Sequence, residues 1–352
     1  MKIGIYDPYL EDLGGGEKYV ASIAECLSRD NSVTVFWNNK EDLGKIGKRF
    51  SLDLSRVSIS ANIFSKEFGF INRLKESKKY DAIIFLSDGS IPFVFSKLFV
   101  HIQQPFVALK PGLKTKLKIR RISKIFYNSN YTREFVDKTF GVKGVVLYPP
   151  IDIKAKGIKK ENIILTVGRF RGKDLPLDDF KKLKVMIDSF KEMVEKGLKG
   201  WKFIVVTGFS KEYEEDFEKI KGLASGFPIE FLLNKPIDEL WDIYSRAKIY
   251  WHAAGYGEDL SVHPEYAEHF GISTVEAMGA GTVPVVISAG GQKEIVDEKS
   301  GFLWNTLEEL KNKAEKLIED EPLLEKMSES ARKRAQIFAG DRFCEELNKI
   351  IK

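Results

Sequence analysis

Two glutamates, Glu268 and Glu276, stand eight residues apart in a segment rich in apolar side chains. If a helix begins near Ser273, Glu276 lies in its first turn and Glu268 in the preceding loop, so both carboxylates point toward one helix N-terminus. The free N–H groups there can hold a diphosphate, and each carboxylate can accept hydrogen bonds from vicinal hydroxyls of a sugar. Two ordinary solvated acids are the alternative, but the apolar neighbours place the pair on a partly buried turn.

Two cations lie upstream of this glutamate pair, at the end of a predicted strand and at the start of the next helix. The apolar run Ile163–Val167 predicts a strand that leads into Gly168 and Arg169, and Lys181 opens the helix that follows. Open α/β sheets bind ligands at the carboxyl ends of their strands. Two cations placed there stabilise the charge of a departing diphosphate. Ordinary surface cations are the alternative, above all for Lys181 in its lysine-rich stretch.

The first predicted strand leads into Gly14, Gly15 and Gly16 at a helix start. Glycines let the backbone approach an anion at a helix N-terminus, although a plain turn explains them equally well. The spacing is not that of the dinucleotide fingerprint, and the second strand lacks a terminal acid for a ribose, so a nicotinamide enzyme is not expected. His101 ends another strand and is expected to face a cleft, with a structural histidine as the alternative.

The stretch from Lys110 to Lys124 carries seven cations and no acid, with leucine and isoleucine between them. This pattern is typical of an amphipathic helix on an anionic membrane, where each cation contributes about 1 kcal/mol. A solvated basic face and an RNA-binding surface are alternatives, but no stacking aromatic motif accompanies the cations, so no nucleic-acid partner is expected. The candidates for contact with an acceptor or a membrane are Lys114, Lys118, Arg120 and Arg121.

Motifs for several other chemistries are absent from the sequence. It has no His or Cys cluster and no Asp-x-Asp, so neither a protein-bound metal nor a cofactor is expected. It also lacks a Gly-x-Ser-x-Gly elbow and a phosphate loop that ends in Gly-Lys-Ser/Thr. Two cysteines, Cys26 and Cys344, are too few for a disulfide framework. With no signal peptide and no apolar run of membrane-spanning length, the chain is expected to be cytoplasmic with reduced thiols.

Short apolar runs alternate with amphipathic helical stretches, which is the pattern of parallel sheets covered by helices. The segment Tyr148-Pro149-Pro150-Ile151-Asp152 interrupts this alternation, because two prolines cannot continue a central strand. A chain of 352 residues is long enough for two domains. We therefore predict an α/β protein with two doubly wound, Rossmann-like domains that face each other across a cleft. The domains comprise residues 1–153 and 154–338, and a helix within 339–352 crosses back to the first domain.

The predicted strands are 2–6, 33–37, 82–87, 97–102, 124–128 and 145–148 in the first domain and 163–167, 202–207, 230–233, 248–252 and 283–288 in the second. The predicted helices are 17–29, 131–140, 182–196, 212–224, 238–247, 273–279, 307–319 and 341–351. The two parts differ in charge. Residues 1–151 hold 24 Lys and Arg against 15 Asp and Glu, a balance of +9, whereas residues 152–352 hold 32 against 36, a balance of −4. An anionic acceptor or surface is therefore expected to meet the first domain.

The segment E-H-F-G-I-S-T-V-E-A-M-G-A-G-T-V-P-V, which contains Glu268 and Glu276, resembles the donor-site motif of retaining glycosyltransferases of family 4. Other features of that family follow in order along nearly the whole chain: the glycine loop, N-S-N-Y-T-R-E, Y-P-P-I-D, V-G-R-F, S-A-G-G-Q-K-E-I-V and S-G-F-L-W. E-H-F-G-I and Y-P-P-I-D are most similar to GDP-mannose-dependent α-mannosyltransferases that act on lipid-linked oligosaccharide.

The resemblance implies a GT-B fold and a retaining, metal-independent hexosyltransferase. Its donor would be a nucleotide diphospho-sugar, expected to be GDP-mannose, and its acceptor a hydroxyl of a lipid-linked or other glycan, with the enzyme peripheral on the cytoplasmic membrane face. Glu276 would bind the ribose, Glu268 the transferred sugar, and Arg169 and Lys181 the diphosphate. The remaining contacts that the resemblance implies come from Gly14, Gly15 and Gly16, from His101 to the sugar, from the backbone of Phe270, Gly271, Ile272, Ser273 and Thr274, and from Lys235 beside the base.

The sequence departs from the family pattern in two places. The Arg and Lys of the family are usually about five residues apart, whereas Lys181 lies twelve residues after Arg169, so Lys173 within the inserted segment is a rival. A second insertion, Gly255 to Tyr266, precedes the glutamate pair and is expected to form a lid. A UDP-sugar transferase of the same fold, a sugar-nucleotide epimerase or hydrolase, and an inactive binding or membrane-docking module are the alternatives.

Overall fold

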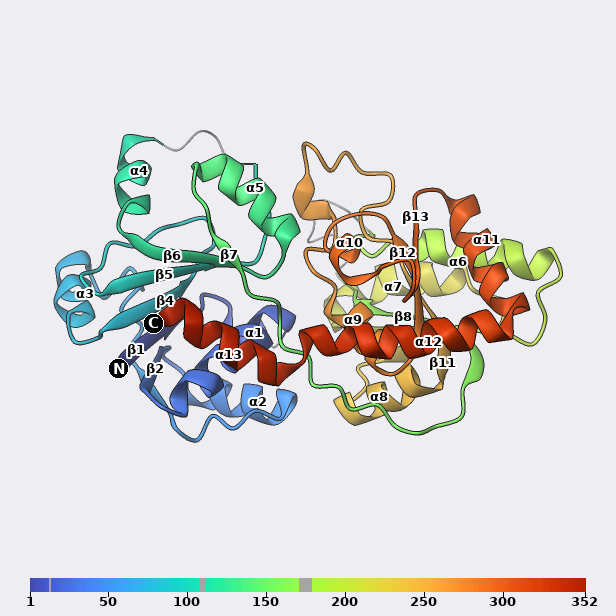
Figure 1. Cartoon of the computed structure of the whole chain (residues 1–352), viewed down its shortest axis with the longest axis horizontal. Coiled ribbons are helices and arrows are strands. Elements are labelled where there is room, and N and C mark those ends of the chain that lie inside the picture. Colours follow the sequence, from blue (N-terminus) through green and yellow to red (C-terminus); the bar gives the residue numbers. More distant parts are fainter. Residues whose placement is uncertain (13, 108–111, 171–178) are drawn as a thin grey trace. The chain divides into compact units, whose positions relative to one another are not determined.

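The computed structural model describes residues 1–12, 14–107, 112–170 and 179–352, and the chain divides into two compact units (Figure 1). Unit 1 consists of Met1–Pro150 together with Gly340–Lys352, and unit 2 consists of Ile151–Ala339. The division falls directly after the two prolines, three residues before the boundary at 153 that the sequence indicates. The final helix belongs to unit 1.

Unit 1 contains a parallel sheet whose described strands have the order β3-β2-β1-β4-β5-β6-β7. The chain order reverses between the neighbours β1 and β4, which is the switch point at which such sheets bind ligands. The strands are β1 (Lys2–Tyr6), β2 (Ser32–Phe36), β3 (Val57–Ser60), β4 (Ala82–Leu86), β5 (Lys97–Ile102), β6 (Ile122–Tyr127) and β7 (Val145–Val146). The helices are α1 (Gly15–Ser28), α2 (Lys40–Phe50), α3 (Phe70–Ser77), α4 (Leu113–Ile119), α5 (Asn130–Phe140) and α13 (Gly340–Ile351).

Successive strand residues of unit 1 pack into two apolar layers, one on each face of the sheet. Ile3 and Ile5 of β1 belong to a layer that includes residues of α1, α2 and α13. Ile83 and Phe85 of β4 belong to the opposite layer. Strands that are covered on both faces read as continuous apolar runs, which is why the sequence pattern located β1, β2, β4, β5 and β6 but missed the partly exposed edge strand β3.

The last helix of the chain packs on the first, and a disulfide joins them. α13 lies beside α1 in unit 1 (Figure 1), with Phe343 and Leu347 in the same apolar layer. Cys26 of α1 and Cys344 of α13 are bonded, with their Cα atoms 5.4 Å apart. The expectation of reduced thiols is therefore wrong. The two cysteines are 318 residues apart in the sequence, so their pairing could not be predicted from it. Only the packing of the two helices brings the sulfurs together.

Unit 2 contains a second parallel sheet, with its described strands in the order β10-β9-β8-β11-β12-β13. Its switch point lies between β8 and β11. The strands are β8 (Glu161–Arg169), β9 (Lys202–Gly208), β10 (Ile229–Leu233), β11 (Ala247–His252), β12 (Val283–Ile287) and β13 (Phe302–Trp304). The helices are α6 (Leu183–Glu195), α7 (Glu214–Gly222), α8 (Ile237–Arg246), α9 (Ile272–Gly279), α10 (Gln292–Ile295), α11 (Leu307–Glu319) and α12 (Glu321–Ala335).

The basic stretch departs most from its prediction. An amphipathic helix over the whole of Lys110–Lys124 is wrong, because α4 ends at Ile119 and β6 begins at Ile122. The side chains of Ile125 and Tyr127 are buried in the sheet, and this burial outweighs the helical spacing. Lys110 lies outside the described residues. Within the part of the chain that the structure describes, no helix has the length and apolar character needed to cross a membrane.

Candidate functional site

The carboxyl end of the unit 2 sheet brings together a lysine, a histidine and a glutamate. Lys181 Nζ lies 2.5 Å from Glu268 Oε2, and His252 Nε2 lies 2.9 Å from the same oxygen. His252 is the last residue of β11, Lys181 precedes α6, and Glu268 lies in the loop before α9. The predicted pair Lys181 and Glu268 is thus joined by His252, which sequence reasoning did not assign to the site. No group of three or more His, Cys, Asp or Glu among the described residues could hold a metal ion.

Burial and ion pairing shift the pKa of Glu268 in opposite directions. Burial alone would raise the pKa of its carboxyl, but the Lys181 ammonium and the hydrogen bond from His252 hold that pKa well below its usual range. Burial lowers the pKa of His252 although Glu268 opposes this effect. The imidazole is therefore neutral, and since an ionised carboxylate only accepts, Nε2–H is the donor. The site presents an ionised carboxylate held by an ammonium and an imidazole.

Glu276 lies in α9, and two tyrosines from neighbouring elements form hydrogen bonds with side chains of this helix. The Tyr244 hydroxyl of α8 donates to Glu276 Oε2 at 3.0 Å, and the Tyr250 hydroxyl of β11 lies 2.8 Å from Ser273 Oγ. Because α9 begins at Ile272, Glu276 lies in its second turn and not in the first turn that the sequence indicates. Its side chain is buried against α8, so its orientation is set by the fold.

The first turn of α9 offers backbone donors to a ligand. The N–H groups of Ile272 and Ser273 have no acceptor among the described residues, as expected for the start of a helix. The Thr274 N–H donates to Gly271 O at 3.0 Å, and a contact from this N–H to a ligand stays a prediction. Contacts from Gly271, Ile272 and Ser273 stay predictions.

Gly290 and Gly291 support the loop that carries Glu268. A Cβ on Gly290 would overlap Glu268 O, and a Cβ on Gly291 would overlap the backbone of Phe270. Gly291 N–H donates to Glu268 O at 2.8 Å, and the Phe270 ring packs edge-on against Phe338 in the interior. The two glycines of S-A-G-G-Q therefore allow their backbone to lie close to the backbone of Glu268 and Phe270. This role was not predicted, although the adjacent glycines in the sequence could have indicated it.

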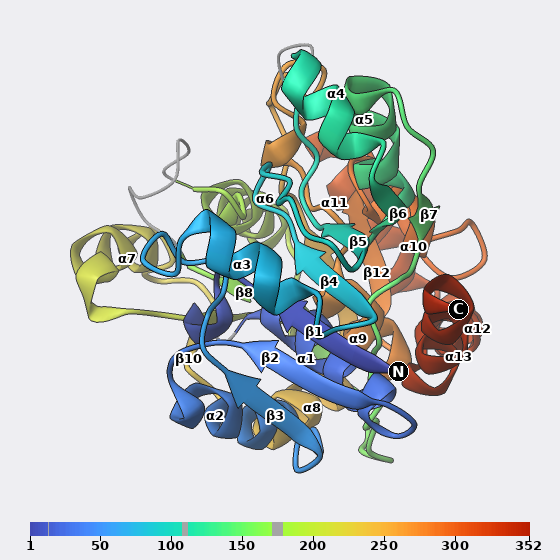
Figure 2. The ribbon, with the colours of Figure 1, turned by 90° about the vertical axis from the view of Figure 1, so that its left-hand side faces the viewer.

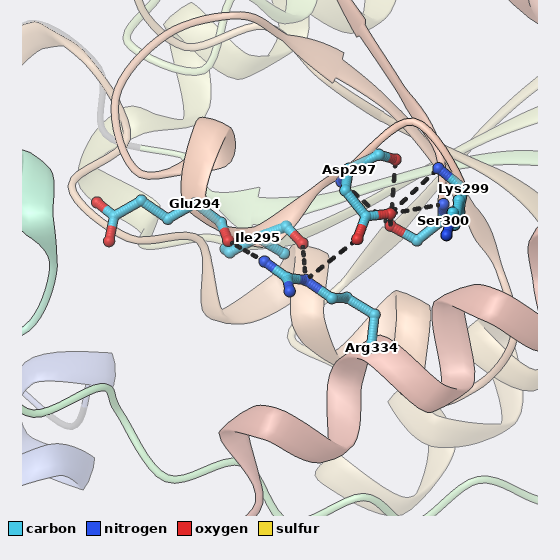
Figure 3. A network of polar contacts seen from close by, with 6 residues as sticks. All are labelled: Glu294, Ile295, Asp297, Lys299, Ser300 and Arg334. Atoms are coloured by element: carbon cyan, nitrogen blue, oxygen red, sulfur yellow. Dashed lines mark hydrogen bonds and ion pairs between the residues drawn. The ribbon is translucent and has the colours of Figure 1, made fainter.

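Arg334 of α12 anchors the segment that follows these glycines (Figure 3). Its guanidinium donates to Glu294 O at 2.8 Å and to Ile295 O at 3.0 Å, at the end of α10. It also lies 3.8 Å from a carboxylate oxygen of Asp297, which accepts hydrogen bonds from Ser300. These bonds fix α10 to α12, and they extend the support of the Glu268 loop into the body of unit 2.

The other cations predicted for the donor have different surroundings. Arg169 ends β8, and its side chain lies over Gly208, where a Cβ would be 3.3 Å from Arg169 Cγ. The methylenes of Lys181 lie over Gly168 in the same way. Lys235 forms an ion pair with Glu239 at 2.8 Å, and its contact with a base stays a prediction. Lys173 lies outside the described residues.

The predicted lid, Gly255 to Tyr266, is tied to the segment that carries Lys181. Glu258 Oε1 lies 2.5 Å from Nζ of Lys182, the neighbour of Lys181 along the chain. His263 pairs with Glu265 at 3.0 Å on the exposed side of the insertion. The insertion therefore lies against the residues before α6, while its role as a lid stays a prediction.

The glycine loop of unit 1 begins α1 with a carboxylate already at its N-terminus. The Gly14 N–H donates to Glu17 Oε2 at 2.6 Å, and Gln103 Nε2 donates to Gly16 O at 3.2 Å. An anion that binds the Gly14 N–H would have to displace the Glu17 carboxylate. The contact of these glycines with a diphosphate stays a prediction.

His101 does not face a cleft, and this expectation is wrong. Its side chain is fully buried and stacks between the rings of Tyr19 and Phe126, with centroids 4.3 Å and 4.6 Å away. Nδ1 lies 3.1 Å from Phe126 O. The end of a strand does not reveal which face its last side chains occupy, and this one enters the covered face. His101 is therefore a structural histidine of unit 1, the alternative given above, because its side chain has no exposed atom that could contact a sugar.

His101 is expected to stay neutral throughout the physiological range, because burial lowers its pKa to about 3. The unfolded chain, with a pKa near 6.5, binds the proton first, so acid costs stability: about 2 kcal/mol is lost between neutral pH and pH 5. Nuclear magnetic resonance of the His101 ring should show no titration from about pH 8 to pH 5. His101→Phe keeps the aromatic stack and should remove this part of the acid destabilisation. A ring that titrates near 6.5 would contradict the prediction.

The four basic candidates of unit 1 divide into two groups. Arg121 stacks on Phe93 at 4.3 Å and donates to Val94 O at 3.2 Å. Its guanidinium is therefore engaged within the fold although the residue is exposed, and its contact with an acceptor or a membrane stays a prediction. Lys114 and Lys118 belong to α4, Arg120 follows it, and no residue of this helix is buried.

Residues 150–334 match the family model described as glycosyl transferases group 1. A GDP-Man:Man(3)GlcNAc(2)-PP-Dol alpha-1,2-mannosyltransferase of Dictyostelium discoideum is 27% identical over 241 residues, which are 64% of this chain and 45% of the relative. The human protein of the same name is 28% identical over 236 residues, 60% of this chain and 43% of the relative. The chain thus matches less than half the length of these curated relatives.

Solved structures resemble the whole chain. HepE of Anabaena in complex with UDP has a TM-score of 0.74 at 17% identity, covering 100% of this chain and 99% of its own. A glycosyltransferase of Rickettsia africae has a TM-score of 0.73 at 14% identity, covering 100% and 98%. Likeness at this identity shows the fold, and the predicted α/β fold of GT-B type is confirmed.

Proposed function

The chain belongs to the family of glycosyl transferases group 1, and from this premise we propose that it transfers mannose from GDP-mannose to a hydroxyl of a lipid-linked glycan, with retention at the anomeric carbon and without a protein-bound metal. The observation that carries the proposal is the cluster of Lys181, His252 and Glu268 at the carboxyl end of the unit 2 sheet, next to the N-terminus of α9. The relatives' names supply the donor and the class of acceptor.

The donor would bind along this edge of the sheet. The ionised Glu268 carboxylate accepts hydroxyls of the mannose, and Glu276, held by Tyr244, accepts those of the ribose. The first N–H groups of α9 and the ammonium of Lys181 bind the diphosphate between them. Lys181 is paired with Glu268 in this structure, so the incoming diphosphate would share the ammonium with that carboxylate.

Departure of the sugar leaves negative charge on the diphosphate, which Lys181 and Arg169 would stabilise. Electrostatic stabilisation of this kind is usually the largest single contribution to catalysis. In a retaining transfer on one face of the sugar, the C–O bond to the diphosphate breaks, the acceptor oxygen bonds to the same carbon, and the diphosphate takes the acceptor's proton. No carboxylate nucleophile is needed for this route.

Transfer from a panel of radiolabelled sugar nucleotides to extracted lipids tests the proposal. GDP-mannose should label the lipids, whereas UDP- and ADP-sugars should not, and an α-mannosidase should release the label. Glu276→Gln should lower the rate about tenfold or more, and Glu265→Gln, which changes an exposed carboxylate in the insertion Gly255–Tyr266, should have little effect. Label from a UDP-sugar, turnover of the donor without acceptor, or an unaffected Glu276→Gln variant would contradict the proposal.

A further inference from the structure

A pocket of about 390 Å³ lies at the switch point of the unit 1 sheet, and none of its lining residues belongs to the candidate donor site of unit 2. Tyr6 and Phe85 are register partners at the carboxyl ends of β1 and β4, with ring centroids 4.9 Å apart. Phe64, Phe70 and Phe93 complete its aromatic wall. Its place and its size are those of a small-molecule site in an open α/β sheet.

Two cations and one acid line the pocket: Arg73 of α3, Lys118 of α4, and Asp88 after β4. Among the described residues neither cation has a carboxylate partner, and the buried Nε of Arg73 has no hydrogen-bond partner. A buried donor without an acceptor costs free energy. An anionic group that enters between the two cations would remove this cost.

Large apolar side chains are exposed on α3, on α4 and in the segment between them, and Phe70 also lines the pocket. Phe70 of α3 is 54% exposed and Leu117 of α4 is 58% exposed, and Phe95 lies between these helices in sequence with half its surface exposed. The Phe93 ring lies 6.4 Å from both Phe70 and Phe95, and Arg121 stacks on it. Figure 2 shows α3 at the front of unit 1 with α4 above it. Apolar surface of this kind marks a binding face.

We propose that this pocket binds the phosphate end of a lipid-linked acceptor, with Arg73 and Lys118 on the phosphate oxygens and the hydrocarbon chain over Phe70, Phe95 and Leu117. The inference rests on the proposed function, because it gives that reaction's acceptor its site. A free phosphate would leave the exposed side chains uncovered, and a neutral lipid would leave both cations without an anion. A lipid phosphate satisfies both, since a guanidinium fork and an ammonium are the usual ligands of phosphate.

Binding of farnesyl diphosphate to the full chain, in the absence of sugar nucleotide, tests the inference by titration calorimetry. Arg73→Gln/Lys118→Gln should weaken binding about tenfold or more, because both phosphate ligands are lost. The matched control is Lys75→Gln/Lys116→Gln, which removes the same charge from the same two helices outside the pocket and should change affinity less than about twofold. Lys181→Met should leave binding unchanged, which separates this pocket from the donor site.

Inorganic diphosphate and farnesol should each bind about tenfold more weakly than farnesyl diphosphate. Equal losses in the two double variants, or equal binding of inorganic diphosphate, would overturn the inference. Leu117→Ser changes an exposed side chain, so this variant remains informative if the double variant fails to fold. It should weaken the binding of farnesyl diphosphate but not the binding of inorganic diphosphate. Unchanged binding of farnesyl diphosphate would count against the pocket.

The two proposals fail in different ways. Mannosyl transfer with an unchanged acceptor KM in Arg73→Gln/Lys118→Gln would refute the pocket and leave the proposed function standing. Binding of farnesyl diphosphate by a chain that transfers no mannose would refute the proposed function and leave the pocket standing.

Discussion

Replacing Lys181 by methionine is expected to lower kcat for mannosyl transfer about 10²- to 10³-fold, while the protein keeps its fold. The Lys181 ammonium lies 2.5 Å from Glu268 Oε2, and its stem covers Gly168 at the end of β8. Methionine keeps the stem and loses the charge. The loss should appear mainly in kcat and less in KM, because the charge on the departing diphosphate develops in the transition state.

The same substitution should move the acidic limb of the pH profile to higher pH. In the wild-type chain Lys181 and His252 hold the pKa of Glu268 well below its usual range against the effect of burial, so the carboxylate stays ionised as the pH falls. Without the ammonium, burial is opposed by His252 alone and the pKa rises. Activity that needs the ionised carboxylate is then lost at a higher pH, which kcat/KM between about pH 4 and pH 8 will measure.

Lys182→Met is the matched control, because this neighbouring lysine pairs with Glu258 and not with Glu268. It should lower transfer less than about tenfold. If Lys181→Met kept wild-type activity, or if Lys182→Met lost as much, the assignment of the diphosphate to Lys181 would be wrong, and Lys173 would be the next lysine to test.

The periodicity of apolar residues was sufficient to predict the fold, because strands buried on both faces stand out as apolar runs. β1 was predicted with its observed bounds, and α11 likewise. α3 was missed for a physical reason: it turns Phe70 and Ile71 outward and buries only Ser77, so its apolar residues do not mark a core-facing side. Phe70, one of the residues that hide this helix from a pattern search, also lines the proposed lipid pocket.

The candidate site was predictable only as far as its motif. Glu268 and Lys181 could be named from their surroundings in the sequence, and they meet in the structure. His252 could not, because its contact depends on β11 lying next to β8, and strand order is a tertiary property. The same limit explains the error on His101, whose place at a strand end says nothing about the face that its ring occupies.

Removing the disulfide between Cys26 and Cys344 is expected to lower the free energy of unfolding of unit 1 by about 3–5 kcal/mol. The bridge closes a loop of 318 residues in the unfolded chain. Chain entropy alone gives about 5–6 kcal/mol for such a loop, and native disulfides usually contribute less than this model predicts. The disulfide stabilises the packing of α13 on α1, and this packing joins Gly340–Lys352 to the rest of unit 1.

The melting temperature of Cys26→Ala/Cys344→Ala, measured with and without a phosphine reductant, should lie about 10 °C below that of the oxidised wild type. The reductant is the internal control. It should bring the wild type down to the variant and leave the variant unchanged, since only the cross-link distinguishes the two chains beyond a small loss of packing at the alanines. Two free thiols in the denatured, unreduced wild type would contradict the disulfide.

Because Phe343 and Leu347 still bury their side chains against α1, α13 should remain docked at room temperature after reduction. The loss should therefore appear as earlier cooperative unfolding, and not as a helix that is already detached in the native state.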